Sequence, residues 1–128
     1  MDDLKVLHVG VAPAAYVKRR TIEIARGSKM RPGEPKVWVT SLESLAKVLS
    51  DKNMLLLMMI RNSRPQSLTE LARMSGRAVS NLSRTLHTME RLGLVTFEEN
   101  GRGRKVPVAV YVSVKLECTI GPQVSEAA

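Results

Sequence analysis

The chain has 128 residues, of which 20 are lysine or arginine and 12 are aspartate or glutamate, so its formal net charge is +8. This length allows one domain with a hydrophobic core plus extensions, and the basic balance favours a polyanionic partner, either a nucleic acid or an anionic membrane surface. The single cysteine, Cys118, excludes an internal disulfide and, with two widely separated histidines, argues against a zinc finger.

The first 36 residues predict a strand and a helix in front of the main domain. Residues 4–11 alternate in a way that is typical of a strand, although the pattern leaves its buried face open. Ala14 to Arg26 carries apolar residues at helical spacing and a basic run, Lys18 to Arg20. We interpret this run as a solvated face, with an accessory phosphate contact as the alternative. Residues 28–36, with two prolines and a glycine, predict an exposed linker. We therefore expect residues 1–36 to form an extension and a candidate dimerisation element.

Residues 37–60 predict a second strand and two helices. Val37 to Thr40 favours extended structure, Ser41 can cap one helix, and Ser50 can cap the next. The second helix contains seven consecutive apolar residues, 54–60, whereas a helix on one core needs apolar residues on about half its circumference. Either the domain wraps this helix completely, or residues 1–40 or a second subunit cover its other side. The run is too short to span a bilayer, and the amino terminus has no signal-peptide pattern, so we expect a cytoplasmic protein with no membrane partner.

Residues 67–95 predict a helix-turn-helix. Ser67 and Glu70 form a capping-box pattern, so a first helix begins near Leu68, and Ser75-Gly76 ends it. From residue 79 the apolar residues recur in steps of three and four along a second helix, up to Gly93. When such a unit binds DNA, its second helix, here residues 78–92, lies in the major groove.

A β-hairpin is expected directly after this unit. Residues 94–99 and 106–114 favour strands, and Asn100-Gly101 between them is typical of a type I′ turn, in which both central residues have positive φ. Pro107 favours an edge position because it cannot donate a ladder hydrogen bond. The fold class is therefore α+β, a winged helix-turn-helix with a three-helix core and a β-hairpin wing. It occupies residues 37–116, and residues 117–128 are expected to be a flexible tail.

The candidate site is a set of donor side chains on the second helix and the hairpin loop. Arginine pairs bidentately with guanine, asparagine with adenine, and serine with bases or phosphates. We expect base reading by Arg77, Ser80, Asn81 and Arg84, at the start of the helix. Phosphate or wing contacts are expected from Ser67, Thr69, Ser83, His87, Arg102, Arg104 and Lys105. Residues 61–105 hold nine basic and four acidic side chains, net +5, which suits double-stranded DNA. The alternatives are ordinary solvated cations or a helix-turn-helix that binds proteins.

Residues 68–95 followed by 97–112 resemble the winged helix-turn-helix of MarR- and ArsR-type regulators, with the helix ending Met89 to Val95 in the pattern Glu-x-x-Gly-Leu-Val. Residues 39–45 and the following apolar helix also resemble small uncharacterised prokaryotic winged-helix proteins. The resemblance implies a homodimeric, sequence-specific transcription factor, usually a repressor that reads a palindrome. The alternative function is that of an antitoxin, which binds both an operator and a toxin protein. The chain lacks the cysteine and histidine ligand sets of metal sensors, and we expect no metal, no cofactor and no enzymatic activity.

Overall fold

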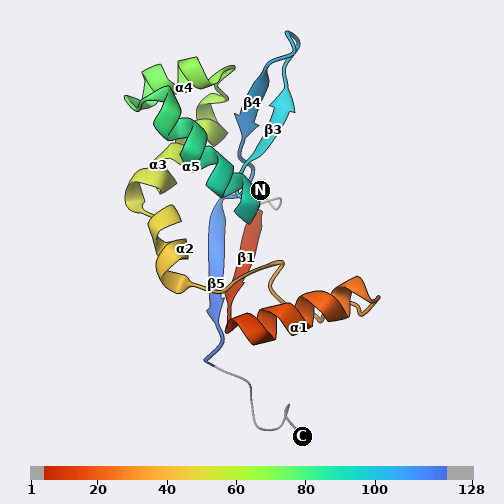
Figure 1. Ribbon diagram of the computed structural model, residues 1–128. Helices are drawn as coiled ribbons and strands as arrows, with labels where there is room; N and C mark the ends of the chain where they lie inside the picture. The colour runs from red at the N-terminus through yellow and green to blue at the C-terminus, as the bar shows by residue number, and fades with distance from the viewer. Residues whose placement is uncertain (1–4, 121–128) are drawn as a thin grey trace, which may run out of the picture. The chain divides into compact units, whose positions relative to one another are not determined.

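The computed structural model describes residues 5–120, which form two compact units (Figure 1). One unit combines residues 6–45 with residues 113–120, and the other combines residue 5 with residues 46–112. The units divide at 45/46 and 112/113, whereas the expected boundaries were 36/37 and 116/117. The reason is strand pairing. Residues 37–39 and residues 113–118 both pair with the first strand, residues 6–11, and therefore belong to the same unit as that strand.

The first unit is built on a three-stranded parallel sheet with the order β2-β1-β5. The central strand is β1 (Val6–Val11), with β2 (Val37–Val39) on one side and β5 (Ser113–Cys118) on the other. Val9 lies opposite Val37 in β2 and opposite Leu116 in β5. Helix α1 (Ala14–Ala25) connects β1 to β2, so the predicted first strand, first helix and second strand are all present.

The two faces of β1 have different partners. Leu7, Val9 and Val11 are buried on one face, which identifies the buried side that the sequence left open. On the other face, a Cβ added at Gly10 would lie 2.6 Å from the ring of Trp38 and 2.7 Å from Pro35. A side chain at position 10 would therefore displace the ring. The Trp38 ring also meets the ring of Tyr16 edge-on, with 5.4 Å between centroids, which connects β2 to α1.

The segment between α1 and β2 is held by Arg20, which is buried, so the interpretation of the Lys18 to Arg20 run as a solvated face is wrong for this residue. The side chain of Arg20 is 5% exposed, and its guanidinium donates to both carboxylate oxygens of Glu34, at 2.7 Å for Nη2 to Oε1, and to the carbonyl of Lys29 at 3.0 Å. The hydrogen bonds between Arg20 and Glu34 raise the pKa of Arg20 and lower the pKa of Glu34 from 4.5 to about 2. The prediction of an exposed linker is therefore wrong for its second half, where Glu34 is tied to α1.

The second unit has the helices and hairpin expected of a winged helix-turn-helix. Helix α2 (Leu42–Val48) leads into it, followed by α3 (Asp51–Ser63), α4 (Leu68–Ser75) and α5 (Val79–Leu92). Strands β3 (Thr96–Glu99) and β4 (Lys105–Val108) then form an antiparallel hairpin. The shared core consists of side chains that are at most 2% exposed, namely Leu56, Ile60, Leu71, Leu82, Leu86, Met89 and Val95.

Local signals in the sequence explain where these helices begin and end. The hydroxyl of Ser50 accepts from the N–H of Asn53 at 3.3 Å, and that of Ser67 accepts from the N–H of Glu70 at 3.0 Å. Gly76 and Gly93 end α4 and α5 with φ of 73° and 85°. One detail of the capping box is wrong: the carboxylate of Glu70 accepts from the N–H of Gln66, at 2.6 Å, and not from that of Ser67.

The apolar run on α3 is covered on one side. Leu56 and Ile60 are buried, while Met54, Leu55 and Met58 are exposed, Leu55 by 60%. The alternative in which the winged domain wraps this helix completely is therefore wrong.

The return strand of the hairpin is shorter than predicted. Residues 106–114 were expected to form one strand, but β4 ends at Val108, whose partner Thr96 is the first residue of β3. Beyond Val108 the chain has no hairpin partner, and from Ser113 it pairs in parallel with β1. Glu117 and Cys118 belong to β5, so the expected flexible tail does not begin at 117. The remainder of that tail, from residue 121, lies outside the described residues.

Candidate nucleic-acid interface

Helix α5 separates its apolar residues from its polar ones. Leu82, Leu86 and Met89 are buried in the core of the second unit. An exposed line of side chains runs along the opposite face at spacings of four, three and four residues: Ser80, Arg84, His87 and Arg91. Within residues 5–120, the guanidinium of Arg84 makes no hydrogen bond and no ion pair. This face is therefore polar, cationic and available to a partner.

Arg77, in the turn before α5, is bound within the protein. Its guanidinium donates to Oδ1 of Asn81 at 2.8 Å, to Oδ1 of Asn53 at 3.0 Å and to the hydroxyl of Thr85 at 3.2 Å. The side chain is half-buried and connects α3 to α5. The sequence predicted a free base-reading arginine here, and it gave no sign of Asn53 or Thr85, because their contact with Arg77 depends on how the helices pack.

Asn81 and His87 are oriented by neighbours on the same helix. Oδ1 of Asn81 already accepts from Arg77, so its amide NH₂ is the group left to donate outward. Nδ1–H of His87 donates to the carbonyl of Ser83 at 2.6 Å, and the His87 ring lies 5.8 Å from the ring of Phe97 between centroids. In its neutral form His87 therefore presents Nε2 as an acceptor on the exposed face. Ser83 is half-buried beside it.

The hairpin loop is organised by Asn100. Its Oδ1 accepts from the backbone N–H of Arg102 at 2.8 Å and of Arg104 at 3.1 Å, and its Nδ2 donates to the carbonyl of Gln66 at 3.2 Å. Gly103, with φ of 74°, takes the left-handed conformation. The predicted two-residue type I′ turn at Asn100-Gly101 is therefore wrong, because a longer loop uses the Asn100 side chain to satisfy its N–H groups.

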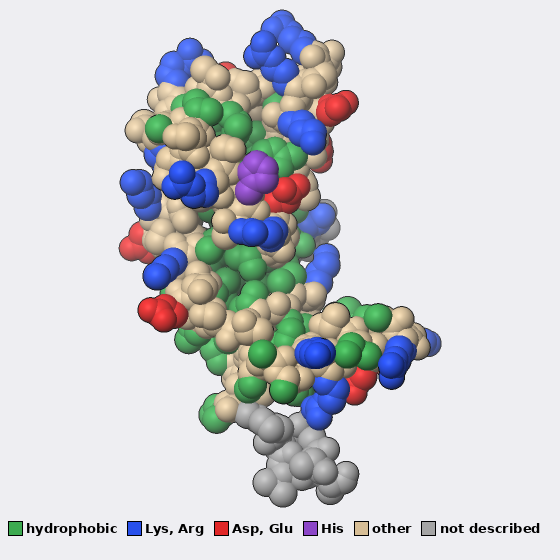
Figure 2. Space-filling model, viewed as in Figure 1, with side chains coloured by type: hydrophobic (Ala, Val, Ile, Leu, Met, Phe, Trp, Pro, Cys, Tyr) green, Lys and Arg blue, Asp and Glu red, His purple; other side chains and the backbone are tan. Residues whose placement is uncertain are grey.

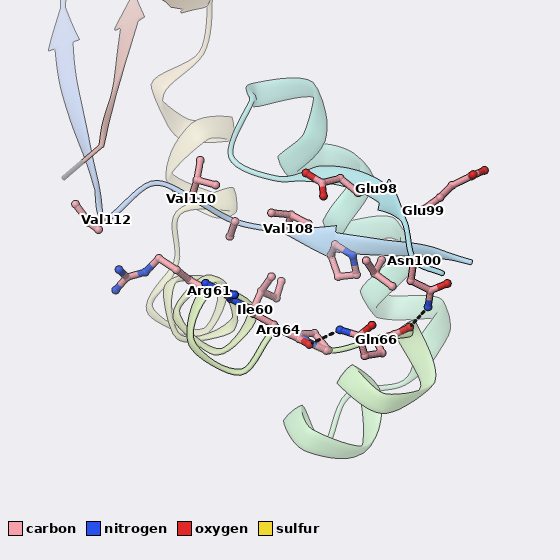
Figure 3. A pocket seen from close by; sticks show the side chains of 14 residues that line it. Ile60, Arg61, Arg64, Gln66, Glu98, Glu99, Asn100, Val108, Val110 and Val112 are labelled. Carbon is pink, nitrogen blue, oxygen red and sulfur yellow. Dashed lines mark hydrogen bonds between the residues drawn. The ribbon is translucent and has the colours of Figure 1, made fainter. Parts of the chain in front are cut away.

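The same asparagine fixes the wing to the helix-turn-helix. Figure 3 shows Asn100 and Gln66 at one end of a pocket between the end of α3 and the hairpin, with Val110 and Val112 at the other end. A second pocket, of about 580 Å³, lies between the start of α4 and the loop and is lined by Ser67, Arg73, Arg102 and Arg104 among others. The structure thus brings Ser67, Arg102 and Arg104 to one cleft, while Thr69 lies outside it.

The positive charge gathers on the wing. Arg102, Arg104 and Lys105 are all exposed. Figure 2 shows Lys and Arg side chains standing over the tip of the β3–β4 hairpin and over α4. Such flexible cations at a protruding loop are suited to phosphate oxygens, since a phosphate contact needs charge more than exact position.

Residues 5–120 hold no cluster of three histidine, cysteine or acidic side chains placed to bind a metal ion. In the same span no helix is long and apolar enough to cross a membrane.

Comparisons with known proteins place the chain in a family. No curated protein matches the sequence. Among solved structures, the chain is similar to one described as a predicted DNA-binding transcriptional regulator from E. coli, with 23% identity, a TM-score of 0.43, and coverage of 75% of this chain and 82% of that one. A TM-score this low carries no inference about function. The resemblance to MarR- and ArsR-type regulators is not confirmed and stays a prediction. The sequence model of the HVO_A0114 family matches residues 48–116, more than half of the chain, and the protein belongs to this family.

Proposed function

We propose that this protein is a sequence-specific transcriptional regulator that binds double-stranded DNA through α5 and the β3–β4 hairpin. One observation carries the proposal: the exposed line of Ser80, Arg84, His87 and Arg91 lies opposite the residues that fix α5 in the core. A helix held in this way can enter the major groove with its polar face toward the bases. The wing then contacts phosphate or the minor groove.

The side chains at the start of α5 divide into base readers and a positioning residue. Arg84 is free to pair with guanine, the amide NH₂ of Asn81 can donate to adenine N7, and Ser80 is exposed on the same turn. Arg77, expected from the sequence to read a base, instead holds Asn81 in place through the bond from Nε to Oδ1. Phosphate contacts are assigned to Ser67, Thr69, Ser83, His87, Arg102, Arg104 and Lys105.

The decisive experiment is the selection of bound fragments from the source genome, followed by binding measurements with two variants. Arg84→Ala should reduce affinity for the selected operator more than for random duplex, since it removes about 1–3 kcal/mol of discrimination. Arg104→Ala should weaken binding to both duplexes and lower the slope of log affinity against log salt by about 0.9 for each phosphate that the wing no longer neutralises. Equal losses on operator and random duplex for both variants would refute the assignment.

The proposed regulator acts as a cytoplasmic homodimer that represses transcription from a palindromic operator. Two-fold symmetry in the protein requires two half-sites related by a two-fold axis in the DNA. The selected fragments should therefore contain an inverted repeat, with half-site centres about one helical turn, or a multiple of it, apart. A reporter behind that operator should be silenced by the protein, and an asymmetric single site would contradict the dimeric mode.

A second candidate function, binding of a protein such as a toxin, is favoured by the exposed apolar side chains Met54, Leu55 and Met58 on α3. Co-expression with the product of the neighbouring reading frame tests it. Leu55→Asp should then abolish the complex, while Arg84→Ala should leave it intact. A complex that survives Leu55→Asp, or no complex at all, would remove this candidate.

A further inference from the structure

Strand β5 is an open edge of the parallel sheet in the first unit. Among the described residues it pairs with β1 alone, and its outer side has no strand beside it (Figure 1). Five of its six residues are exposed, including Leu116 at 45%. An open edge with exposed apolar side chains is a template for pairing with another strand.

The backbone groups on this edge alternate in direction. The N–H of Thr119 donates to the carbonyl of Val11 at 2.7 Å, while the carbonyl of His8 accepts from Lys36 on the β2 side. The odd-numbered residues of β1 therefore face β5. By the alternation of a strand, Lys115 and Glu117 direct their N–H and C=O groups toward β1. Val114, Leu116 and Cys118 direct theirs outward, where a partner strand can reach them.

The side chains of β5 are complementary to the same strand in reverse. Suppose that two copies pair antiparallel about a two-fold axis at Leu116. The outward backbone groups of Leu116 then meet those of Leu116 in the other copy, and those of Val114 meet those of Cys118. Lys115 then lies directly opposite Glu117 in both directions, in pairs whose side chains are close. The same antiparallel pairing centred on Lys115 or on Glu117 would instead place two like charges opposite each other. Among these three axes, charge therefore favours the one at Leu116.

We infer that β5 is the site of self-association, where it pairs antiparallel with β5 of a second copy of this chain. The two sheets then form one continuous sheet of six strands in the order β2-β1-β5-β5-β1-β2. The pairing covers Leu116 and Val114. It also places Lys115 beside Glu117 of the other copy. Glu117 already contacts Nε2 of His8 at 3.0 Å in its own subunit, so its carboxylate is held on this face. This pairing supplies the interface of the homodimer proposed above, but its tests require no DNA.

The charge pattern provides a test by exchange. Wild-type protein should have twice the mass of one chain by light scattering after size exclusion. Lys115→Glu makes both cross-strand pairs acidic, and Glu117→Lys makes both basic, so each should weaken the dimer roughly tenfold to several hundredfold. An equimolar mixture of the two variants restores opposite charges in both pairs and should form a heterodimer. The double variant Lys115→Glu with Glu117→Lys should dimerise with itself.

These outcomes also separate the interface from a general loss of folding. Glu117→Lys removes the contact with His8 in the single and the double variant alike, so recovery of dimer in the double variant must come from the cross-strand pairs. A monomeric wild type would overturn the inference. So would single variants that remain dimeric, or a mixture that stays monomeric while each variant has the circular dichroism of the wild type.

Cross-linking locates the two-fold axis independently. In a Cys118→Ser background, Leu116→Cys should form an intermolecular disulfide under mild oxidation, because facing residues of a hydrogen-bonded antiparallel pair have Cα atoms about 5.5 Å apart. Ser113→Cys in the same background is the matched control. It is exposed on the same strand, but the two copies of residue 113 lie far apart in this register. Equal cross-linking at both positions would overturn the register.

Discussion

Replacing Arg77 with alanine tests whether this residue is a structural connection or a base reader. The substitution removes three hydrogen bonds at once, to Asn53 on α3 and to Asn81 and Thr85 on α5. It also leaves the oxygens that accepted these bonds, Oδ1 of Asn53, Oδ1 of Asn81 and the hydroxyl of Thr85, without the donor that the described residues supply. If Arg77 connects the two helices, the free energy of unfolding must fall in the absence of any DNA.

The size of the loss follows from the number and exposure of these bonds. A hydrogen bond within a protein contributes about 0.5–1.5 kcal/mol net, so three such bonds give about 1.5–4.5 kcal/mol. Because Arg77 is half-buried, water can replace part of each bond, and we expect the lower part of this range, about 1.5–2.5 kcal/mol. Arg84→Ala is the matched control. Its exposed side chain makes no hydrogen bond to any other described residue, so it should change stability by at most about 0.5 kcal/mol.

Urea unfolding followed by circular dichroism measures both variants, and a double-mutant cycle tests the contact itself. Arg77→Ala and Asn53→Ala should be non-additive, with a coupling of about 0.5–1.5 kcal/mol. If Arg77→Ala were as stable as the wild type and lost only DNA discrimination, Arg77 would be a base reader and its role as a connection between helices would be refuted.

Three further predictions concern contacts inside one unit or the other. Hydrogen bonds from Arg20 lower the pKa of Glu34 to about 2, so Glu34 stabilises the fold above pH 4.5 and loses this contribution as the pH falls from about 4.5 to 2. The free energy of unfolding in urea should therefore differ less between pH 7 and pH 3 for Glu34→Gln than for the wild type. Gly10→Ala places a Cβ 2.6 Å from the Trp38 ring and should destabilise the fold by about 1–3 kcal/mol, with altered fluorescence of this single tryptophan. Leu86→Ala empties a site that is 0% exposed and should cost about 2–5 kcal/mol, measured by denaturant titration.

The sequence predicted most of what short-range rules determine. Helices α3 and α4 begin at the capping serines Ser50 and Ser67, and α4 and α5 end at Gly76 and Gly93, because these signals and the helix ends they set lie within a few residues of each other. The burial of Leu82, Leu86 and Met89 is also predictable, because apolar residues at this helical spacing lie on one side of the helix, and that side packs on the core. The outward line on α5 follows directly from that stripe.

The features that the sequence missed are those settled by distant segments. The valine-rich run after the wing has strand propensity throughout, but its pairing depends on which partners are in reach, and β1 competes with β3 for it. The loop at Asn100 depends on a carbonyl of Gln66, which is 34 residues away. Arg77 likewise looked free because its partner Asn53 lies 24 residues away. In each case the sequence identified the residue as important but did not identify the distant residue that it contacts.

The open edge of β5 and the exposed face of α5 lie on different compact units, which makes their contributions to DNA binding separable. The salt dependence of binding counts the phosphates neutralised, with a slope of about −0.9 for each one on B-DNA. A monomeric variant keeps one winged unit, so Lys115→Glu should bind the operator with about half of the wild-type slope while its α5 and wing are unchanged. Mixing it with Glu117→Lys should restore the full slope together with the dimer. If the dimeric wild type instead had the same slope as monomeric Lys115→Glu, only one winged unit of the dimer would contact DNA at a time. The palindromic mode of binding would then be refuted, while the interface at β5 would remain.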